Sequence, residues 1–162
     1  MKTPAVGSIA PNFTLTAQDG SSFTLYDEIK LNPLILVFYT MDGSPTCDKL
    51  LCRINIDVSE FAEAGLQIVG INYADPSDHD RYARSKLLRL RLLSDDHFRV
   101  SAAYDCLFSI GPIKVIRYSV VGIGRDGIIR YFKRGQPSNA EIIAGMQLAG
   151  EKGESLGQSL LQ

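Results

Sequence analysis

The chain has little excess charge, no long apolar run and few cysteines, and each shortage excludes a class of protein. Its 162 residues carry 17 Lys and Arg against 18 Asp and Glu, so no electrostatic reason favours nucleic acid or an anionic membrane as a partner. The longest apolar run, residues 34–39, is far too short to span a bilayer. No apolar segment follows Met1, so we expect no secretory signal and a cytoplasmic location.

The three cysteines, Cys47, Cys52 and Cys106, are an odd number and do not suit a framework of structural disulfides. In a reducing compartment, two close cysteines more often take part in catalysis or bind a metal. Cys106 lies in an apolar context and is expected to be buried and unreactive, with a role as a distant resolving cysteine as the alternative. His79 and His97 lie in acidic helix-start sequences and are expected to be solvated.

The first half of the chain predicts a β-hairpin followed by a βαβ unit. Two β-rich runs flank residues 18–21, where Asp-Gly forms the turn. A buried strand at 34–39, a helix at 45–64 that ends at Gly65, and a strand at 66–72 follow with short joints. Such a crossover is right-handed and pairs its two strands in parallel.

The second half is expected to add short helices and an antiparallel hairpin. A short helix reaches about Tyr104, and an apolar, irregular loop covers residues 106–112. The β-rich runs 115–122 and 128–133 predict a second hairpin. A capping box that begins at Ser138 opens the last helix.

This order of elements predicts an α/β domain with a thioredoxin-like fold. Its mixed central sheet would carry helices on both faces and an N-terminal β-hairpin extension. We expect one domain over residues 1–150 and a flexible tail over residues 151–162, which are rich in Gly, Ser and Gln. The loop before Cys47 leaves the carboxyl end of a central strand, where open α/β sheets place their ligands.

A strong helix start surrounds Cys47. Ser44 suits the N-cap, and Pro45 suits the first helical position, where a missing N–H costs nothing. Cys47 therefore falls in the first turn, where unpaired backbone N–H groups and the helix dipole favour a negative charge. A thiol in this position is expected to react as its thiolate.

The spacing of Cys47 and Cys52 argues against a permanent disulfide. In a regular helix, five residues correspond to a rise of about 7.5 Å and a rotation of about 140°. A disulfide needs Cα atoms closer than about 7 Å and converging Cβ vectors. The two cysteines can therefore bond only after local unwinding, which suits a cycle between two states.

In these residues the chain resembles the peroxiredoxins, which carry Pro-x-x-x-Thr/Ser-x-x-Cys at the start of this helix. The corresponding residues here are Thr40, Ser44 and Cys47. The Cys-x-x-x-x-Cys spacing resembles the atypical two-cysteine branch called peroxiredoxin Q or bacterioferritin comigratory protein. The resemblance runs from Val6 to the last helix, and its supporting matches are residues 68–75, residues 92–95 and Arg117.

The resemblance implies a thiol peroxidase that needs no cofactor and no metal. The Cys47 thiolate would attack a hydroperoxide and become a sulfenic acid. The Ser44 hydroxyl would bond to the peroxide oxygens, while Arg117 would hold the thiolate charged and stabilise the charge that develops on the leaving oxygen. Cys52 would then form a disulfide with Cys47, and a thioredoxin or glutaredoxin-like protein would reduce it. The protein would be a monomer or a weak dimer.

Thr40 departs from the family motif, because it stands where the peroxiredoxins have proline. It retains a hydrogen-bonding group without the rigid ring, so a degenerate peroxiredoxin that acts as a redox sensor stays open as an alternative. A metal-binding protein of the same fold, such as a copper chaperone, also stays open, although that class uses Cys-x-x-x-Cys and a later His. A thiol–disulfide oxidoreductase would need Cys-x-x-Cys, which the chain lacks.

Overall fold

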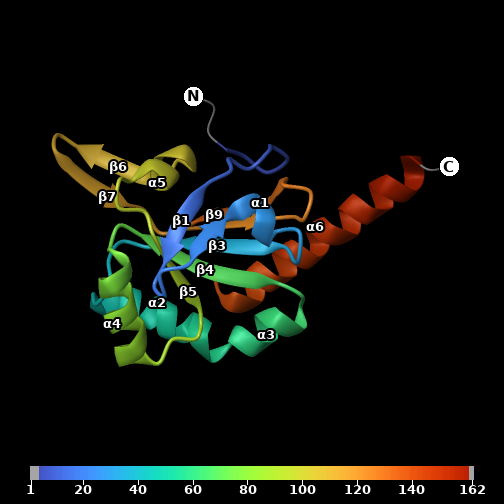
Figure 1. Ribbon diagram of the computed structural model, residues 1–162. Helices are drawn as coiled ribbons and strands as arrows, with labels where there is room; N and C mark the ends of the chain where they lie inside the picture. Colours follow the sequence, from blue (N-terminus) through green and yellow to red (C-terminus); the bar gives the residue numbers. More distant parts are fainter. Residues whose placement is uncertain (1–3, 161–162) are drawn as a thin grey trace.

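The computed structural model describes the backbone of residues 4–160 and the side chains of residues 4–150 (Figure 1). A seven-stranded sheet with the order β2-β1-β5-β4-β3-β8-β9 forms the centre. Its strands are β1 (Thr14–Ala17), β2 (Ser22–Thr24), β3 (Leu34–Phe38), β4 (Gln67–Asn72), β5 (Arg91–Ser94), β8 (Ser119–Ile123) and β9 (Ile129–Arg134). The helices are α1 (Leu25–Glu28), α2 (Pro45–Ile56), α3 (Val58–Glu63), α4 (Pro76–Lys86), α5 (Arg99–Ala103) and α6 (Asn139–Leu160).

The sheet is mixed, as the order of elements predicts. Strand β3 runs parallel to β4 and antiparallel to β8, and β4 runs parallel to β5. The N-terminal hairpin of β1 and β2 joins this sheet through antiparallel pairing of β1 with β5. The predicted βαβ unit and the N-terminal extension are both confirmed.

Strand β3 has a core on each of its faces. Leu34, Leu36 and Phe38 lie in one buried cluster, which also receives side chains of α1 and α5. Ile35 and Val37 lie in the other cluster, with side chains of α2, α3, α4 and α6. Figure 1 shows α2, α3 and α4 together on one side of the sheet. Burying each such side chain stabilises the fold by roughly 1.5–3 kcal/mol, so the strand that leads to Cys47 is firmly held.

The helix predicted over residues 45–64 is broken at Asp57. Helix α2 ends at Ile56 and α3 begins at Val58, while Asp57 has φ −101° and ψ 16°. The Asp57 carboxylate accepts a hydrogen bond from the Asn139 amide at 2.8 Å, at the start of α6. The prediction of one continuous helix was therefore wrong, because a contact with a distant element holds the break.

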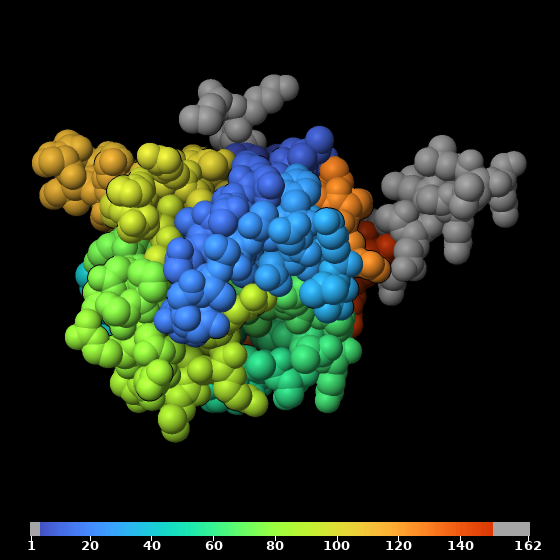
Figure 2. Space-filling model, viewed as in Figure 1, coloured from blue at the N-terminus to red at the C-terminus, as the bar shows by residue number. Residues whose placement is uncertain are grey.

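The region expected to be an irregular loop is a second, separate hairpin. Strands β6 (Leu107–Ile110) and β7 (Ile113–Ile116) form a two-stranded sheet around Gly111, which has φ +56°. Figure 2 shows this hairpin projecting from the body of the molecule. The strand predicted over 115–122 is accordingly split into β7 and β8.

Helix α6 closes the fold, and the Ser138 side chain caps its start as predicted. The Ser138 hydroxyl accepts a hydrogen bond from the Glu141 backbone N–H at 3.2 Å. The backbone of α6 is helical to Leu160. The flexible tail over residues 151–162 stays a prediction, since its side chains and residues 161–162 lie outside the description. Within the described residues, no helix has the length and apolar character needed to cross a membrane.

Candidate active site

The predicted helix start is present at the end of β3. Ser44 has extended backbone angles, φ −74° and ψ 145°, and its Oγ accepts a hydrogen bond from the Cys47 backbone N–H at 3.2 Å. Pro45 is the first residue of α2. Cys47 therefore lies in the first turn, at the positive end of the helix dipole, and it is fully buried.

A tyrosine that the sequence reasoning missed contacts the Cys47 sulfur. Tyr118 lies between β7 and β8, and its Oη is 2.9 Å from Cys47 Sγ. Burial and the hydrogen bond to Cys47 raise the pKa of Tyr118, while the Thr40 and Ser44 hydroxyls act in the opposite direction. Tyr118 thus stays protonated at neutral pH. Only its place beside Arg117 in the sequence could have drawn attention to it.

Thr40 joins the end of β3 to the end of β7. Its Oγ1 donates a hydrogen bond to the Ile116 carbonyl at 3.1 Å. A proline side chain has no donor with which to make this bond. Thr40 also lines a groove of about 470 Å³ with Val115, Ile116, Arg117, Tyr118, Arg134 and Gly135.

Arg117 lines the same groove, and its guanidinium stacks on an aromatic ring. Its guanidinium lies 5.0 Å from the centre of the Phe108 ring, in a cation–π contact. Its backbone N–H donates to the Cys106 carbonyl at 2.7 Å. Among the contacts of the described residues, none joins the Arg117 side chain to Cys47. A catalytic role for Arg117 stays a prediction.

Cys52 lies further along α2 and is half-buried, whereas Cys47 is fully buried. Both are free thiols. Because residues five positions apart in a helix point in directions about 140° apart, the two sulfurs do not face one another in this state. The structure therefore places both predicted cysteines on one helix without bringing them together.

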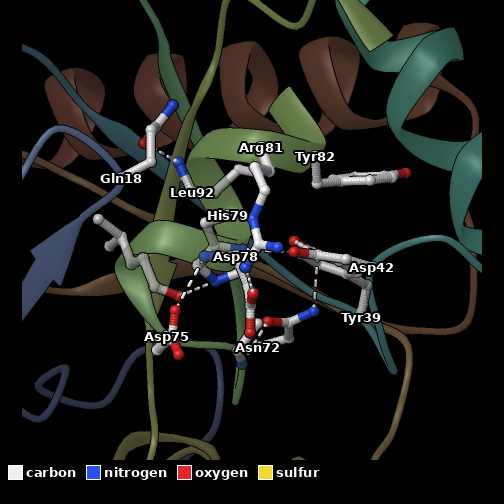
Figure 3. A network of polar contacts seen from close by, with 12 residues as sticks. Gln18, Tyr39, Asp42, Asn72, Asp75, Asp78, His79, Arg81, Tyr82 and Leu92 are labelled. Carbon is white, nitrogen blue, oxygen red and sulfur yellow. Dashed lines mark hydrogen bonds and ion pairs between the residues drawn. The ribbon is translucent and has the colours of Figure 1, made fainter. Parts of the chain in front are cut away.

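A buried polar network lies behind the loop that carries the site (Figure 3). The Asp42 carboxylate accepts hydrogen bonds from the Tyr39 hydroxyl at 2.5 Å and from the Asn72 amide at 2.9 Å. Its other oxygen lies 2.7 Å from Nδ1 of His79, and Nε2 of His79 lies 3.2 Å from the Leu93 carbonyl. These contacts tie the loop between β3 and α2 to strands β4 and β5 and to helix α4.

The expectation that His79 is solvated was wrong, because its side chain is fully buried. One ring nitrogen faces the Asp42 carboxylate and the other faces the Leu93 carbonyl, so the buried ring has a polar partner at each nitrogen. His97 is exposed, as expected, with 73% of its side chain accessible. No group of three His, Cys, Asp or Glu side chains suited to holding a metal occurs among the described residues.

Cys106 is buried, as the sequence predicts. Its thiol donates a hydrogen bond to the Tyr104 carbonyl at 3.3 Å, and burial raises its pKa. We expect iodoacetamide at pH 8 to modify Cys52 in the native protein at least tenfold faster than Cys106, because only a thiolate reacts. Mass spectrometry of peptides would measure both rates. Guanidinium-unfolded protein serves as the control. Equal alkylation rates for Cys52 and Cys106 in the native protein would contradict the assignment of Cys106 as a buried, unreactive thiol.

The raised pKa of Cys106 also has a consequence for stability. An exposed thiol in the unfolded chain has a pKa of about 8.5. Above that pH the unfolded state binds fewer protons than the folded state, so the contribution of Cys106 to stability is present below about pH 8.5 and is lost as the pH rises.

Three kinds of comparison show which known proteins the chain resembles. The profile described as "AhpC/TSA family" matches residues 6–132. "Peroxiredoxin Q, chloroplastic" from Gentiana triflora is 39% identical over 90 residues, which cover 56% of this chain and 41% of the relative. The protein of the same name from Triticum aestivum is 30% identical over 130 residues, which cover 80% of this chain and 59% of the relative. The chain thus spans roughly half the length of these curated relatives.

A solved structure supports the fold. The crystal structure of a Xylella fastidiosa PrxQ mutant has a TM-score of 0.83 and 19% sequence identity to this chain. The match covers 93% of this chain and 99% of the other. The thioredoxin-like fold of the peroxiredoxins is thereby confirmed.

Proposed function

The chain belongs to the AhpC/TSA family, and we propose that it is a thiol-dependent peroxidase that reduces hydrogen peroxide and organic hydroperoxides through Cys47. The observation that carries this proposal is the position of Cys47 in the first turn of α2, behind the Ser44 cap. The helix start favours the thiolate, which is the reactive form of a cysteine.

In the first step, the Cys47 thiolate attacks the terminal oxygen of the hydroperoxide. A sulfur–oxygen bond forms, the O–O bond breaks, and the leaving oxygen takes a proton to become water or an alcohol. The Ser44 oxygen already accepts from the Cys47 backbone, so its O–H group can donate to the peroxide. Arg117 would leave Phe108 and move along the groove towards the leaving oxygen. Thr40 holds the loop to β7.

In the second step, Cys52 attacks the sulfur of the Cys47 sulfenic acid. The new S–S bond displaces the hydroxyl group, which leaves as water, and a thioredoxin or glutaredoxin-like dithiol later reduces the disulfide. The start of α2 must unwind for this step. With 12 residues, α2 is short, and its break at Asp57 separates it from α3. Unwinding the start of α2 would therefore leave α3 in place.

Replacing Cys52 with serine tests this scheme. We expect hydrogen peroxide to convert Cys47 to sulfenic acid at the wild-type rate, whereas turnover with a thioredoxin-reducing system should fall at least about tenfold because no internal disulfide forms. Peroxide consumption measures turnover, and dimedone labelling measures sulfenic acid. Cys106→Ser is the matched control and should keep wild-type turnover. Loss of turnover in Cys106→Ser with wild-type turnover in Cys52→Ser would instead identify Cys106 as the resolving cysteine.

The proposed setting is a reducing compartment, namely the cytoplasm, because Cys47 must return to the thiolate after each cycle. The proposed assembly is a monomer or a weak dimer. A redox sensor, the alternative raised by Thr40, would consume about one equivalent of peroxide per chain and then stop. Catalytic consumption of many equivalents in the thioredoxin assay distinguishes the peroxidase from that alternative.

A further inference from the structure

We propose that Tyr118 is a catalytic residue of this reaction. Its hydroxyl would donate the hydrogen bond that stabilises the Cys47 thiolate, a part that the resemblance assigns to Arg117, and would then contact the incoming peroxide. The inference rests on the proposed peroxidase function and adds a residue that lies outside the Thr40, Ser44 and Cys47 motif.

The first observation is the contact itself. Tyr118 Oη lies 2.9 Å from a sulfur whose residue is fully buried. Any peroxide that reaches Cys47 Sγ therefore arrives beside this hydroxyl. A phenol that meets a thiolate at this distance acts as the donor, since the anion can only accept. Hydrogen bonds to charged groups are stronger than those between neutral groups.

The second observation is that the basic side chains of the groove are engaged elsewhere. Arg117 stacks on Phe108. Arg134 donates to the Ser119 hydroxyl at 2.7 Å and lies 3.6 Å from the Asp105 carboxylate. Within residues 4–150, no Arg, Lys or His side chain forms a hydrogen bond or an ion pair with Cys47. Tyr118 is thus the side chain placed to stabilise the thiolate.

The third observation is that Tyr118 is held in place at both its backbone and its hydroxyl. The Gly135 backbone N–H donates to the Tyr118 carbonyl at 2.7 Å. Its hydroxyl lies 2.9 Å from Cys47 Sγ. Tyr39, the other phenol affected by the charge of Cys47, already donates to Asp42. A fixed donor of this kind needs no reorganisation when the thiolate attacks.

The same contact suggests the opposite role, because a hydroxyl that covers the sulfur could simply obstruct the peroxide. The two roles predict opposite effects of Tyr118→Phe, which removes the donor and keeps the ring. A donor predicts slower reaction of Cys47. An obstruction predicts unchanged or faster reaction.

The test compares Tyr118→Phe with its parent in the Cys52→Ser background. We expect the rate of Cys47 alkylation by iodoacetamide at pH 7, followed by peptide mass spectrometry, to fall about tenfold or more, because a hydrogen bond to a charged group is lost. The rate of sulfenic acid formation with hydrogen peroxide should fall by a similar factor. Tyr73→Phe is the control, since Tyr73 is 40% exposed and stacks on Phe98, and both rates should stay at the parent values.

Alkylation or sulfenic acid formation that is unchanged or faster would overturn the proposal. Thermal unfolding of each variant, recorded by circular dichroism, shows whether the compared proteins are folded before their rates are measured. Alkylation needs no peroxide, so it tests Tyr118 even if the wild-type protein fails to consume peroxide. Failure of the peroxidase function is therefore distinguishable from failure of this inference.

Discussion

Replacing Cys47 with serine is expected to lower peroxide consumption by about a thousandfold or more, because removal of a nucleophile leaves only the binding contribution of the site. A serine hydroxyl is not ionised at neutral pH and cannot form a sulfenic acid. It can still contact the Tyr118 hydroxyl, which lies 2.9 Å from the sulfur in the native protein. The variant should therefore fold normally.

The initial rate of hydrogen peroxide loss in the thioredoxin-coupled assay measures this effect. Cys106→Ser serves as the control, because it also removes a fully buried thiol but lies outside the proposed reaction. Cys47→Ser should also give no dimedone adduct at position 47. Retention of more than a tenth of the wild-type rate would show that another residue performs the chemistry.

The second large effect is expected from Asp42→Asn, which should lower the thermal unfolding midpoint by about 10 °C. The change removes the charge that faces His79 and leaves fewer acceptors for the Tyr39 and Asn72 donors. Leaving a buried donor without its acceptor costs about 1–3 kcal/mol for each donor, and three side chains contact the Asp42 carboxylate. For a chain of this size, each kcal/mol shifts the midpoint by about 2–4 °C.

The chain contains a matched control for this prediction. Asp96 and His97 form a second Asp–His pair at 3.7 Å, with side chains that are 65% and 73% exposed. Exposed pairs contribute about 0–1 kcal/mol, so Asp96→Asn should shift the midpoint by no more than about 4 °C. Calorimetry of both variants measures the difference. Similar shifts would mean that the buried network contributes no more than a surface pair.

Local chemistry explains what the sequence reasoning predicted well. The Ser44-Pro45 helix start depends on residues within one turn, so it can be predicted from the local sequence alone. The βαβ unit follows from a buried strand, a short joint and the handedness rule. The burial of Cys106 follows from its apolar neighbours.

The features that escaped prediction depend on distant partners. Asp42 lies 37 positions from His79, and Tyr118 lies 71 positions from Cys47. The acidic sequence around His79 is typical of a solvated helix start, and only the partner on another element makes burial favourable. The break at Asp57 likewise depends on Asn139, 82 positions away.

The hairpin of β6 and β7 escaped prediction for a different reason. Its exposed apolar side chains, including Ile110 and Ile113, do not alternate with polar ones in the way that marks a half-buried strand. Thr40 shows how the structure refines a motif. This residue stands where the family has proline, and its hydroxyl donates a hydrogen bond to the Ile116 carbonyl. A hydrogen bond between the loop after β3 and the end of β7 thus takes the place of the rigid proline ring.

The central claim is that Cys47 and Cys52 form a redox pair on one helix that must unwind. The most direct measurement treats the reduced protein with one equivalent of hydrogen peroxide and maps its non-reduced peptides by mass spectrometry. We predict a disulfide between Cys47 and Cys52, together with faster hydrogen–deuterium exchange in α2 of the oxidised protein. A disulfide to Cys106, or oxidation without any disulfide, would contradict the claim.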